Sequence, residues 1–350
     1  MVKAIGIAGR QVGTGHPCFI IAEAGVNHNG EIETALRLID AAAEAGADAV
    51  KFQTFKADRL ATQDAPKAEY QHATTDDAET QFDMLRRLEL SPEFHRTLRE
   101  HCRRRGICFL STPFDEDSAD FLEELGVPAF KIPSGEITNL PFLAHVARKG
   151  RPMIVSTGMS TLEEVAAAVH TIEGAGNDDL VLLHCVSNYP ARPADANLRA
   201  MRTMEEAFRM PVGYSDHTMG TEVALAAVAL GACVIEKHLT LDRSLPGPDH
   251  RASMEPEDLR RLVRGVRVVE QALGHGRKEP ASSEAEIAKV ARKSLVAVRD
   301  ISAGSRLTDD MLGARRPGNG LSPPMRSLFL GRRAKQDIQA GTLLRPDMVV

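Results

Sequence analysis

No stretch of this 350-residue chain contains the roughly 20 consecutive apolar residues that a membrane-spanning helix needs. The first 19 residues also lack the continuous apolar core of a secretory signal. Lysine and arginine form no long run, and the formal net charge is −5, which argues against a nucleic-acid footprint or an anionic membrane surface. We therefore expect a soluble, cytoplasmic protein that binds neither nucleic acid nor membrane.

Cysteine is scarce, and its pattern suggests no pairing. The residues are odd in number, scattered and mostly set in apolar stretches: Cys18, Cys102, Cys108, Cys185 and Cys233. Reduced core residues of a cytosolic protein fit this pattern better than a disulfide framework does. No two cysteines have the spacing of a structural zinc site.

Short apolar runs recur along the chain, each followed by a helical pattern. They cover residues 19–26, 49–55, 108–114, 129–135, 153–159, 180–186, 212–218 and 234–240. Eight such units within about 250 residues predict a (β/α)8 TIM barrel, with a doubly wound open sheet as the alternative. The long polar segment 56–90 is a candidate active-site loop.

The helical pattern of the barrel ends near Gly274, and a polar connector follows. We predict a catalytic barrel at 1–275, a linker at 276–292 and a small β-rich domain at 293–350. The last segment contains an internal repeat, because residues 297–304 are echoed by 334–341. Two similar β-rich halves predict one compact domain, which is barely large enough to be stable by itself.

Polar side chains occur at the carboxyl end of every predicted strand. In a parallel barrel these ends meet at one mouth, whereas a charge in mid-strand is costly. Lys51 and Lys131, on separate strands, need acceptors close by, which Glu23 and Glu136 supply in one interpretation. We favour a phosphate held by both lysines and by a rim of hydroxyl groups: Thr112, Ser134, Ser156 and Ser215.

Two histidines, His217 and His238, follow the seventh and eighth predicted strands. Their imidazoles are expected to reach one divalent metal that leaves positions open for water and substrate oxygens. On spacing alone, histidines that hydrogen-bond to carboxylates such as Asp216 are almost as good an explanation.

Successive side chains of a β-strand point to opposite faces, which indicates how the residues around His238 are oriented. This alternation places Glu236 on the face of His238, toward the shared site. Lys237, between them, is expected to point the other way, toward an acidic partner.

Motifs along nearly the whole chain resemble, in the same order, those of the bacterial sialic acid synthases. They are IAEAGVNHNG (21–30), AVKFQTFKADRL (49–60), STPFD (111–115), FKIPSGEITNLP (130–141), STGMST (156–161), GYSDHT (213–218), EKHLTLD (236–242), GPDH (247–250) and RRPGNG (315–320). The C-terminal segment resembles the antifreeze-like (SAF) domain that follows the barrel in these enzymes.

The resemblance implies an N-acetylneuraminate synthase, a transferase that condenses phosphoenolpyruvate with open-chain N-acetylmannosamine and water. The products are N-acetylneuraminate and phosphate. The alternative within the family is an N,N'-diacetyllegionaminate synthase, which uses 2,4-diacetamido-2,4,6-trideoxymannose. The pseudaminic acid branch is less favoured, because KIPSGEITNLP is closer to the sialic and legionaminic enzymes.

The resemblance also implies roles for individual residues. Mn2+ or Mg2+ is expected on His217 and His238, where it polarises the sugar aldehyde. Glu136 is the first choice for proton transfer, with Glu23 orienting or sharing that role. Phosphoenolpyruvate is expected to be held by Lys51, Thr112, Lys131, Ser134, Ser156, Ser187 and Ser215. Some family members have Asn in place of Ser187, so either Ser187 or Asn188 contacts the phosphate.

Sugar hydroxyl groups are expected to contact Gln53, Tyr189 and Asp249. Arg316 is expected to reach from the SAF domain of one subunit to the acetamido group bound in the other, which implies a domain-swapped homodimer. A solvated arginine beside Arg315 is the alternative.

Two other classes of function stay open at this point. A barrel aldolase uses a lysine such as Lys131 or Lys237 as a Schiff-base nucleophile. A non-catalytic sugar-binding protein is the third hypothesis, although it has no need of paired lysines and histidines together.

Overall fold

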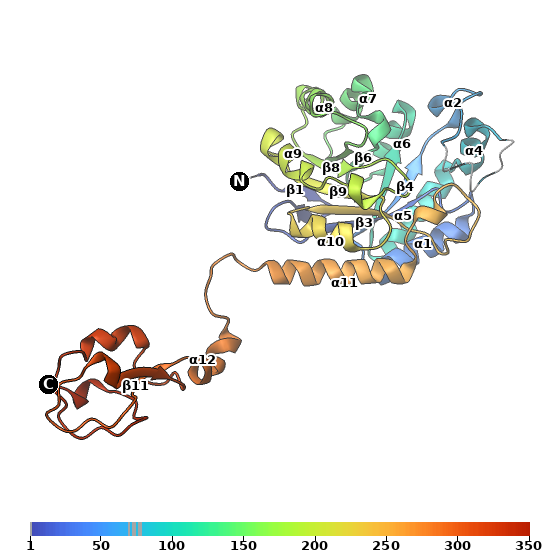
Figure 1. Ribbon diagram of the computed structural model, residues 1–350. Helices are drawn as coiled ribbons and strands as arrows, with labels where there is room; N and C mark the ends of the chain where they lie inside the picture. Colours follow the sequence, from blue (N-terminus) through green and yellow to red (C-terminus); the bar gives the residue numbers. More distant parts are fainter. Residues whose placement is uncertain (1, 69–70, 72–74, 76–78) are drawn as a thin grey trace. The chain divides into compact units, whose positions relative to one another are not determined.

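The computed structural model describes residues 2–68, 71, 75 and 79–350. They form two compact units, Met1–Gly274 and His275–Val350, which Figure 1 colours from blue to orange and from orange to red. None of the described helices is long and apolar enough to cross a membrane. All five cysteines are free thiols.

The first unit is built around one parallel sheet of eight strands, in the order β5-β4-β3-β10-β9-β8-β7-β6. The strands at the two ends of this order, β5 and β6, lie next to each other, so that the sheet is barrel-shaped. The predicted TIM barrel is therefore confirmed. The strands are β3 (Phe19–Gly25), β4 (Ala49–Thr54), β5 (Cys108–Pro113), β6 (Phe130–Ile132), β7 (Met153–Ser156), β8 (Leu180–Cys185), β9 (Val212–Asp216) and β10 (Val234–His238).

Helices alternate with the strands, and most of them cover the outside of the sheet. They are α1 (Ile32–Ala45), α2 (Ala57–Leu60), α4 (Gln81–Leu88), α5 (Pro92–Arg105), α6 (Glu116–Leu125), α7 (Leu140–Ala147), α8 (Leu162–Gly174), α9 (Ala200–Phe208), α10 (Glu222–Ala229) and α11 (Pro256–Leu273). Figure 1 shows the strands enclosed between α6–α9 on one side and α1, α5, α10 and α11 on the other.

Local sequence explains where several of these helices begin. Ser91 accepts a hydrogen bond from the amide of Phe94, and Pro92 occupies the first turn of α5. Thr161 and Glu164 form a reciprocal capping box at the start of α8. Such caps satisfy backbone amides that a helix leaves unpaired at its first turn.

The amino end of the barrel is closed by an N-terminal hairpin of β1 (Ile5–Ile7) and β2 (Arg10–Val12). Its apolar side chains join the cluster that fills the barrel interior: Ile5, Ile7, Val12, Phe19, Ile21, Ala49, Leu110, Ala129, Ile154, Val181, Leu183, Cys233 and Val234. A second, larger cluster lies between the strands and the helices. Because the amino end is filled with apolar side chains, polar ligands have access from the carboxyl end only.

The segment 56–90, predicted as an active-site loop, contains α2 and α4. Gln81, the first residue of α4, lines the cavity at the carboxyl end of the barrel. Residues 69–70, 72–74 and 76–78 of this segment lie outside the described residues.

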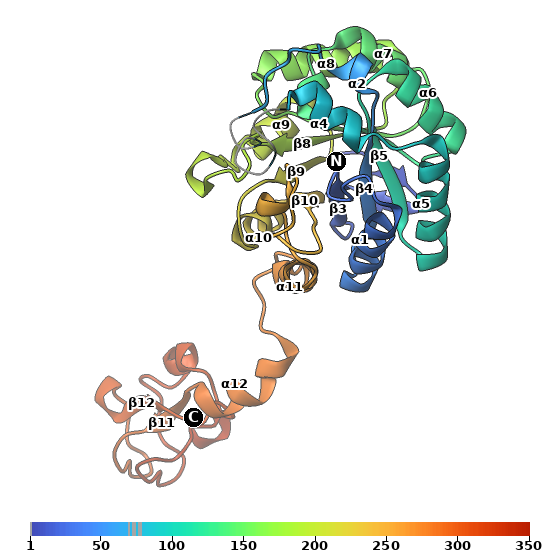
Figure 2. The same ribbon diagram turned by 90° about the vertical axis from the view of Figure 1, so that its right-hand side faces the viewer.

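The second unit contains α12 (Ala285–Ala291) and an antiparallel pair, β11 (Ser294–Ala297) and β12 (Leu312–Arg315). Figure 2 shows this pair after α12. Short 3₁₀ turns complete both units: η1 (Ser134–Glu136), η2 (Pro193–Asp195), η3 (His250–Ala252), η4 (Ser282–Glu284), η5 (Asp309–Met311), η6 (Pro323–Leu328) and η7 (Pro346–Met348).

The internal repeat of the sequence becomes a local twofold relation in this unit. Ile301 and Ile338, which are equivalent in the two halves, exchange two backbone hydrogen bonds of 2.8 Å. Asp300 and Asp337 are equivalent too, and each accepts a 2.7 Å hydrogen bond from a backbone amide of the other half. The two halves therefore share one apolar core, because each is too small to bury its own.

Candidate active site

A cavity of about 420 Å³ opens at the carboxyl ends of the barrel strands. Every strand of the barrel, or the residues directly after it, contributes to its lining. The predicted site residues that line it are Glu23, Lys51, Gln53, Thr112, Lys131, Ser134, Ser156, Ser187, Tyr189, Ser215, His217 and His238. Residues scattered from the first strand to the last thus meet in one place.

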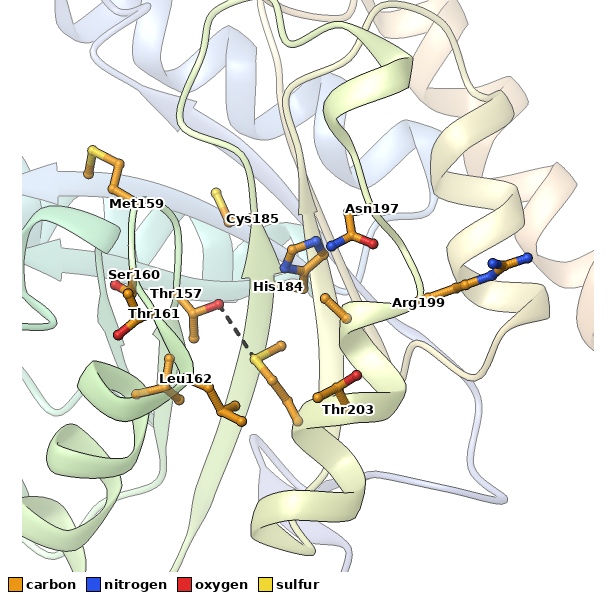
Figure 3. A pocket seen from close by; sticks show the side chains of 13 residues that line it. Thr157, Met159, Ser160, Thr161, Leu162, His184, Cys185, Asn197, Arg199 and Thr203 are labelled. Atoms are coloured by element: carbon orange, nitrogen blue, oxygen red, sulfur yellow. Dashed lines mark hydrogen bonds between the residues drawn. The ribbon is translucent and has the colours of Figure 1, made fainter.

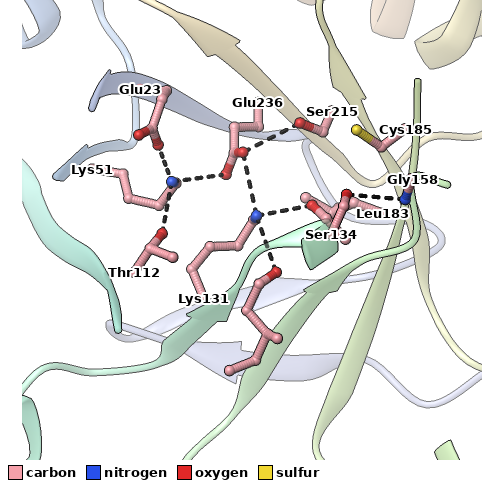
Figure 4. A network of polar contacts seen from close by, with 12 residues as sticks. Glu23, Lys51, Thr112, Lys131, Ser134, Gly158, Leu183, Cys185, Ser215 and Glu236 are labelled. Carbon is pink, nitrogen blue, oxygen red and sulfur yellow. Dashed lines mark hydrogen bonds and ion pairs between the residues drawn. The ribbon is translucent and has the colours of Figure 1, made fainter. Parts of the chain in front are cut away.

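Lys51 of β4 is buried and lines this cavity, and Figure 4 shows its side chain with those of Glu23 and Thr112. Its ammonium group forms an ion pair with Glu23 of β3. It also donates a 2.9 Å hydrogen bond to the hydroxyl of Thr112 on β5. Neighbouring strands therefore hold the lysine from both sides, since β3, β4 and β5 are adjacent in the sheet.

Lys131 of β6 approaches from the other side of the barrel. Its Nζ donates a 2.8 Å hydrogen bond to Ser156 and lies 3.4 Å from Oε1 of Glu236. The other oxygen of the same carboxylate, Oε2, lies 3.8 Å from Nζ of Lys51. One carboxylate thus stands between the two ammonium groups (Figure 4), which shows that both can reach a single anion.

The two buried carboxyl groups differ in acidity. Burial raises the pKa of Glu23 to about 7, against the opposing effect of Lys51. Burial disfavours ionisation of Glu236 as well, but Lys131 and Lys51 outweigh it and lower the pKa of that carboxyl group. Near neutral pH, two ammonium groups therefore face one fully ionised and one partly protonated carboxyl group. Burial also lowers the pKa of Lys131, and an anionic ligand between the two lysines would counteract this effect.

Hydroxyl groups form the rim beside Lys131. Ser134 accepts a 3.0 Å hydrogen bond from the amide of Gly158. A Cβ atom at position 158 would collide with the hydroxyl oxygens of Ser187 and Ser134. Glycine therefore allows both serine hydroxyls to approach the backbone closely. Ser187 lines the cavity, whereas Asn188 is not among the lining residues.

The two histidines lie side by side at the ends of β9 and β10. Their ring centroids are 5.5 Å apart, and the ring of Tyr189 lies 4.1 Å from that of His217. Nδ1 of His217 is 2.7 Å from the carbonyl oxygen of Val186, which leaves Nε2 on the other side of the ring. Nδ1 of His238 is buried and has no hydrogen-bond partner among the described residues.

This pair of imidazoles fits a divalent metal. Burial lowers the pKa of His238 well below its usual value, so the ring is neutral with a lone pair available. The contact of His217 with a backbone carbonyl is the outer contact that metal-binding histidines usually make. Among the described residues, no group of three or more His, Cys, Asp or Glu side chains is arranged for a metal ion. Two imidazole nitrogens suit an ion that takes its other ligands from water and substrate.

Three predicted residues are not among those that line the cavity. Glu136 is half-buried in η1, and its carboxylate accepts a 2.8 Å hydrogen bond from Asn139. Asp249 is buried, 4.0 Å from Nδ1 of His238, and burial raises its pKa to about 6. Arg316 belongs to the second unit, where it donates a 3.1 Å hydrogen bond to the carbonyl of Ala291.

Several lining residues have no role assigned from the sequence, among them the polar side chains of Glu236 and Gln81. Glu236, which stands between the lysines, shares its face with His238 through the alternation of β10, and this was the signal available. Lys131 contacts Glu236 and not Glu136, its acidic partner in one interpretation of the sequence. Gln81 comes from the polar segment 56–90, whose length is a general signal for a functional loop.

A second cavity, of about 410 Å³, lies beside the first and is lined by the segment after β7, by α8, by the end of β8 and by α9 (Figure 3). It shares Met159 and Cys185 with the first cavity and reaches past His184 to Asn197 and Arg199. The described residues that line it include no lysine and no carboxylate. We therefore place the chemistry in the first cavity, where the charged groups converge.

Comparisons with known proteins identify the family to which the chain belongs. A model of the NeuB family matches residues 38–278, and a model of the SAF domain matches residues 292–350. An N,N'-diacetyllegionaminic acid synthase from Legionella pneumophila is 51% identical over 95% of this chain and 94% of its own. One from Campylobacter jejuni is 48% identical over 93% and 98%, respectively.

A solved structure is similar as well. The N-acetylneuraminic acid (sialic acid) synthetase from Leptospira borgpetersenii superposes with a TM-score of 0.73 at 38% identity, covering 82% of this chain and 95% of that one. Fold and matches define a barrel enzyme followed by a SAF domain. The chain belongs to the NeuB family, as a phosphoenolpyruvate-condensing synthase of nonulosonic acids.

Proposed function

We propose that this enzyme is an N,N'-diacetyllegionaminate synthase. It condenses phosphoenolpyruvate with 2,4-diacetamido-2,4,6-trideoxymannose and water, and it releases phosphate. The identity of 51% and 48% with two synthases of that name is the observation that carries the choice of sugar. It favours the alternative prediction over N-acetylneuraminate synthase, which we keep as the second candidate because of the structural similarity to a sialic acid synthetase.

Phosphoenolpyruvate is proposed to bind where Glu236 now meets both lysines. Its carboxylate and phosphate are drawn by the ammonium groups of Lys51 and Lys131, which already contact the two oxygens of one carboxylate. Its oxygens also receive hydrogen bonds from the surrounding hydroxyl groups: Thr112, Ser134, Ser156, Ser187 and Ser215. Several charge-assisted contacts in a buried site hold the enol ester in one orientation.

His217 and His238 are proposed to hold Mn2+ or Mg2+ beside this anion. The metal, when bound, withdraws electrons from the aldehyde oxygen of the open-chain sugar. The two rings stand at the ends of adjacent strands, so they orient the sugar with its aldehyde carbon toward C3 of the enol. Gln53, Tyr189 and Asp249 are proposed to contact the hydroxyl groups of the sugar.

The reaction forms a bond between C3 of phosphoenolpyruvate and the aldehyde carbon. Water then adds to C2, and the resulting hemiketal phosphate loses phosphate by cleavage of the C–O bond. One proton must reach the former aldehyde oxygen, and another must leave the water. Glu23 is suited to proton transfer because its pKa of about 7 leaves both forms populated at neutral pH. Glu136 remains the first sequence-based choice for the same role.

Further proposals concern the assembly and the compartment. Arg316 is proposed to complete the site of a partner subunit, which makes the enzyme a domain-swapped homodimer. The five free thiols suit the reducing cytoplasm.

A substrate panel tests the function. Phosphate release from phosphoenolpyruvate is measured with N-acetylmannosamine, its 6-phosphate and the 2,4-diacetamido-6-deoxy sugar, each with and without Mn2+. We expect the highest kcat/KM with the last sugar and loss of turnover after metal removal. A higher kcat/KM with N-acetylmannosamine would establish the second candidate. Trapping of a sugar on the protein by borohydride would favour the Schiff-base class, and no phosphate release with any sugar would favour a binding protein.

A further inference from the structure

A buried ion pair lies directly behind the two histidines, outside the cavity. Asp216 of β9 and Lys237 of β10 are opposite each other in the register of the two strands. Their side chains are 0% and 2% exposed, and Nζ of Lys237 lies 2.7 Å from Oδ2 of Asp216. The same Nζ also donates a hydrogen bond to the carbonyl oxygen of Thr218. As the sequence predicts, the lysine points away from the cavity toward an acidic partner.

The second carboxylate oxygen of Asp216 is occupied as well. Oδ1 accepts a 2.9 Å hydrogen bond from the backbone amide of Thr218 and a 2.8 Å hydrogen bond from its hydroxyl. His217 lies between these two residues in the chain. Its backbone is therefore held on both sides by one side chain.

Alternation connects this pair to the imidazoles. Asp216 and Lys237 face outward, whereas His217 and His238, the next residues in each strand, line the cavity. The ion pair thus connects Asp216 and Thr218, which flank His217, to Lys237, which precedes His238. The distance between the two rings depends on how these two strand ends are fixed against each other.

Stability alone does not explain two charges at this position. Removing both from water is costly, and apolar residues of similar volume often stabilise a protein as well or better. Two apolar side chains, however, do not fix how the ends of β9 and β10 are aligned with each other. An ion pair with three further hydrogen bonds does, because each of these contacts is directional.

We propose that the Asp216–Lys237 pair, together with Thr218, is a positioning device that holds His217 and His238 at the separation required for one divalent ion. This inference rests on the proposed metal-binding role of the two histidines. It assigns to Asp216 and Lys237 a function in metal affinity, without contact to substrate.

The double variant Asp216→Asn/Lys237→Met removes both charges and keeps an acceptor for Thr218. Binding of Mn2+ alone to the purified full-length protein is measured by the electron paramagnetic resonance signal of free Mn2+. We expect the dissociation constant to rise roughly 10-fold, the lower end of the range for loss of direct outer partners, because the pair acts on the histidines through the backbone. The dissociation constant for phosphoenolpyruvate without metal should stay within about twofold, because Lys51 and Lys131 are untouched.

Asp48→Asn is the matched control. Asp48 is a buried carboxylate at the opposite end of the barrel, where it pairs with Arg10 and Arg267 and accepts a 2.8 Å hydrogen bond from the amide of Ile20. This variant loses the ion pairs of a buried carboxylate with two partly exposed arginines, so its melting temperature should fall. Its affinity for Mn2+ should remain that of the unaltered protein.

The outcomes are distinguishable. If His238→Ala binds Mn2+ as tightly as the unaltered protein does, the metal role of the histidines fails, and this inference fails with it. If His238→Ala loses Mn2+ but the double variant does not, only the positioning role is overturned. An equal loss in Asp48→Asn also overturns it, because the effect would then be general. Should the double variant not fold, Thr218→Val decides, and unchanged Mn2+ affinity in that variant contradicts the proposal.

Discussion

Glu23 and Glu236 are chemically identical residues on adjacent strands, yet their surroundings separate their acidities. Glu236 faces two ammonium groups and is ionised, whereas burial dominates at Glu23 and raises its pKa to about 7. Pairs of titratable groups separated in this way are typical of acid–base catalysis. The raised pKa of Glu23 therefore leads to a prediction about the pH dependence of the reaction.

If protonated Glu23 supplies the proton to the former aldehyde oxygen, kcat/KM for the sugar should fall as pH rises above about 7. The sign follows from the raised pKa, because the carboxyl group is protonated below this value and ionised above it. Glu23→Gln should lower kcat by on the order of 100-fold and abolish this alkaline limb. A variant that keeps the same limb would show that another group is responsible. Steady-state phosphate release from pH 5 to 9 provides the measurement.

Gly158 is the second residue whose surroundings decide its identity. An added methyl group would collide with the hydroxyl oxygens of Ser134 and Ser187. We expect Gly158→Ala to displace both hydroxyls and to raise the KM for phosphoenolpyruvate on the order of 10-fold, since one or two hydrogen bonds to a charged group are lost. Gly135→Ala, where a Cβ meets nothing within 4 Å, is the matched control. Equal KM values in the two variants would show that the close approach of the Ser134 and Ser187 hydroxyls to Gly158 is not important for binding of phosphoenolpyruvate.

At the scale of elements, the turn between β3 and α1 contains a buried histidine. His28 lies next to the rings of Phe52 and Phe94, with ring centroids 6.3 and 6.0 Å away. Its Nδ1 accepts a 2.9 Å hydrogen bond from the amide of Gly30. Burial lowers its pKa to about 3, so the turn is built around a neutral ring.

This burial makes stability depend on pH in a defined direction. Between the unfolded pKa near 6.5 and the folded pKa near 3, the unfolded chain binds the extra proton, so stability is lost as pH falls through this window. From pH 7 to pH 5 the free energy of unfolding should fall by about 2 kcal/mol more than in His28→Gln. Urea unfolding of both proteins at the two pH values measures the difference. Parallel losses in the two proteins would rule out His28 as the titrating group.

At the scale of the whole molecule, the proposed domain-swapped dimer makes a prediction about mixed subunits. Arg316→Ala and His238→Ala should each be inactive alone, because each lacks one part of every site. If Arg316 serves the partner, a mixed dimer has one site in which both residues are intact. After denaturation and joint refolding of equal amounts, about a quarter of the activity should return. No recovery, with dimers verified by light scattering, would place Arg316 in the site of its own subunit.

Much of this molecule was predictable because the relevant signals are local. Apolar runs at strand length, helix caps such as Ser91 and Thr161, and polar residues at strand ends all depend on neighbours within a few positions. They were sufficient for the barrel, for the repeat of the second unit and for most of the cavity residues. Ordered motifs such as GYSDHT added the family, which the comparisons confirm.

What the tertiary structure alone decided is which of these side chains meet. That Lys51 and Lys131 share Glu236 depends on the closure of the barrel, since β4 and β6 are brought together only when β5 meets both. Period-two alternation assigns a face to Glu236 but cannot say that two lysines from other strands lie beside it. The acidity of Glu23 likewise follows from burial and charge in three dimensions, which depend on distances through space and not on spacing along the chain.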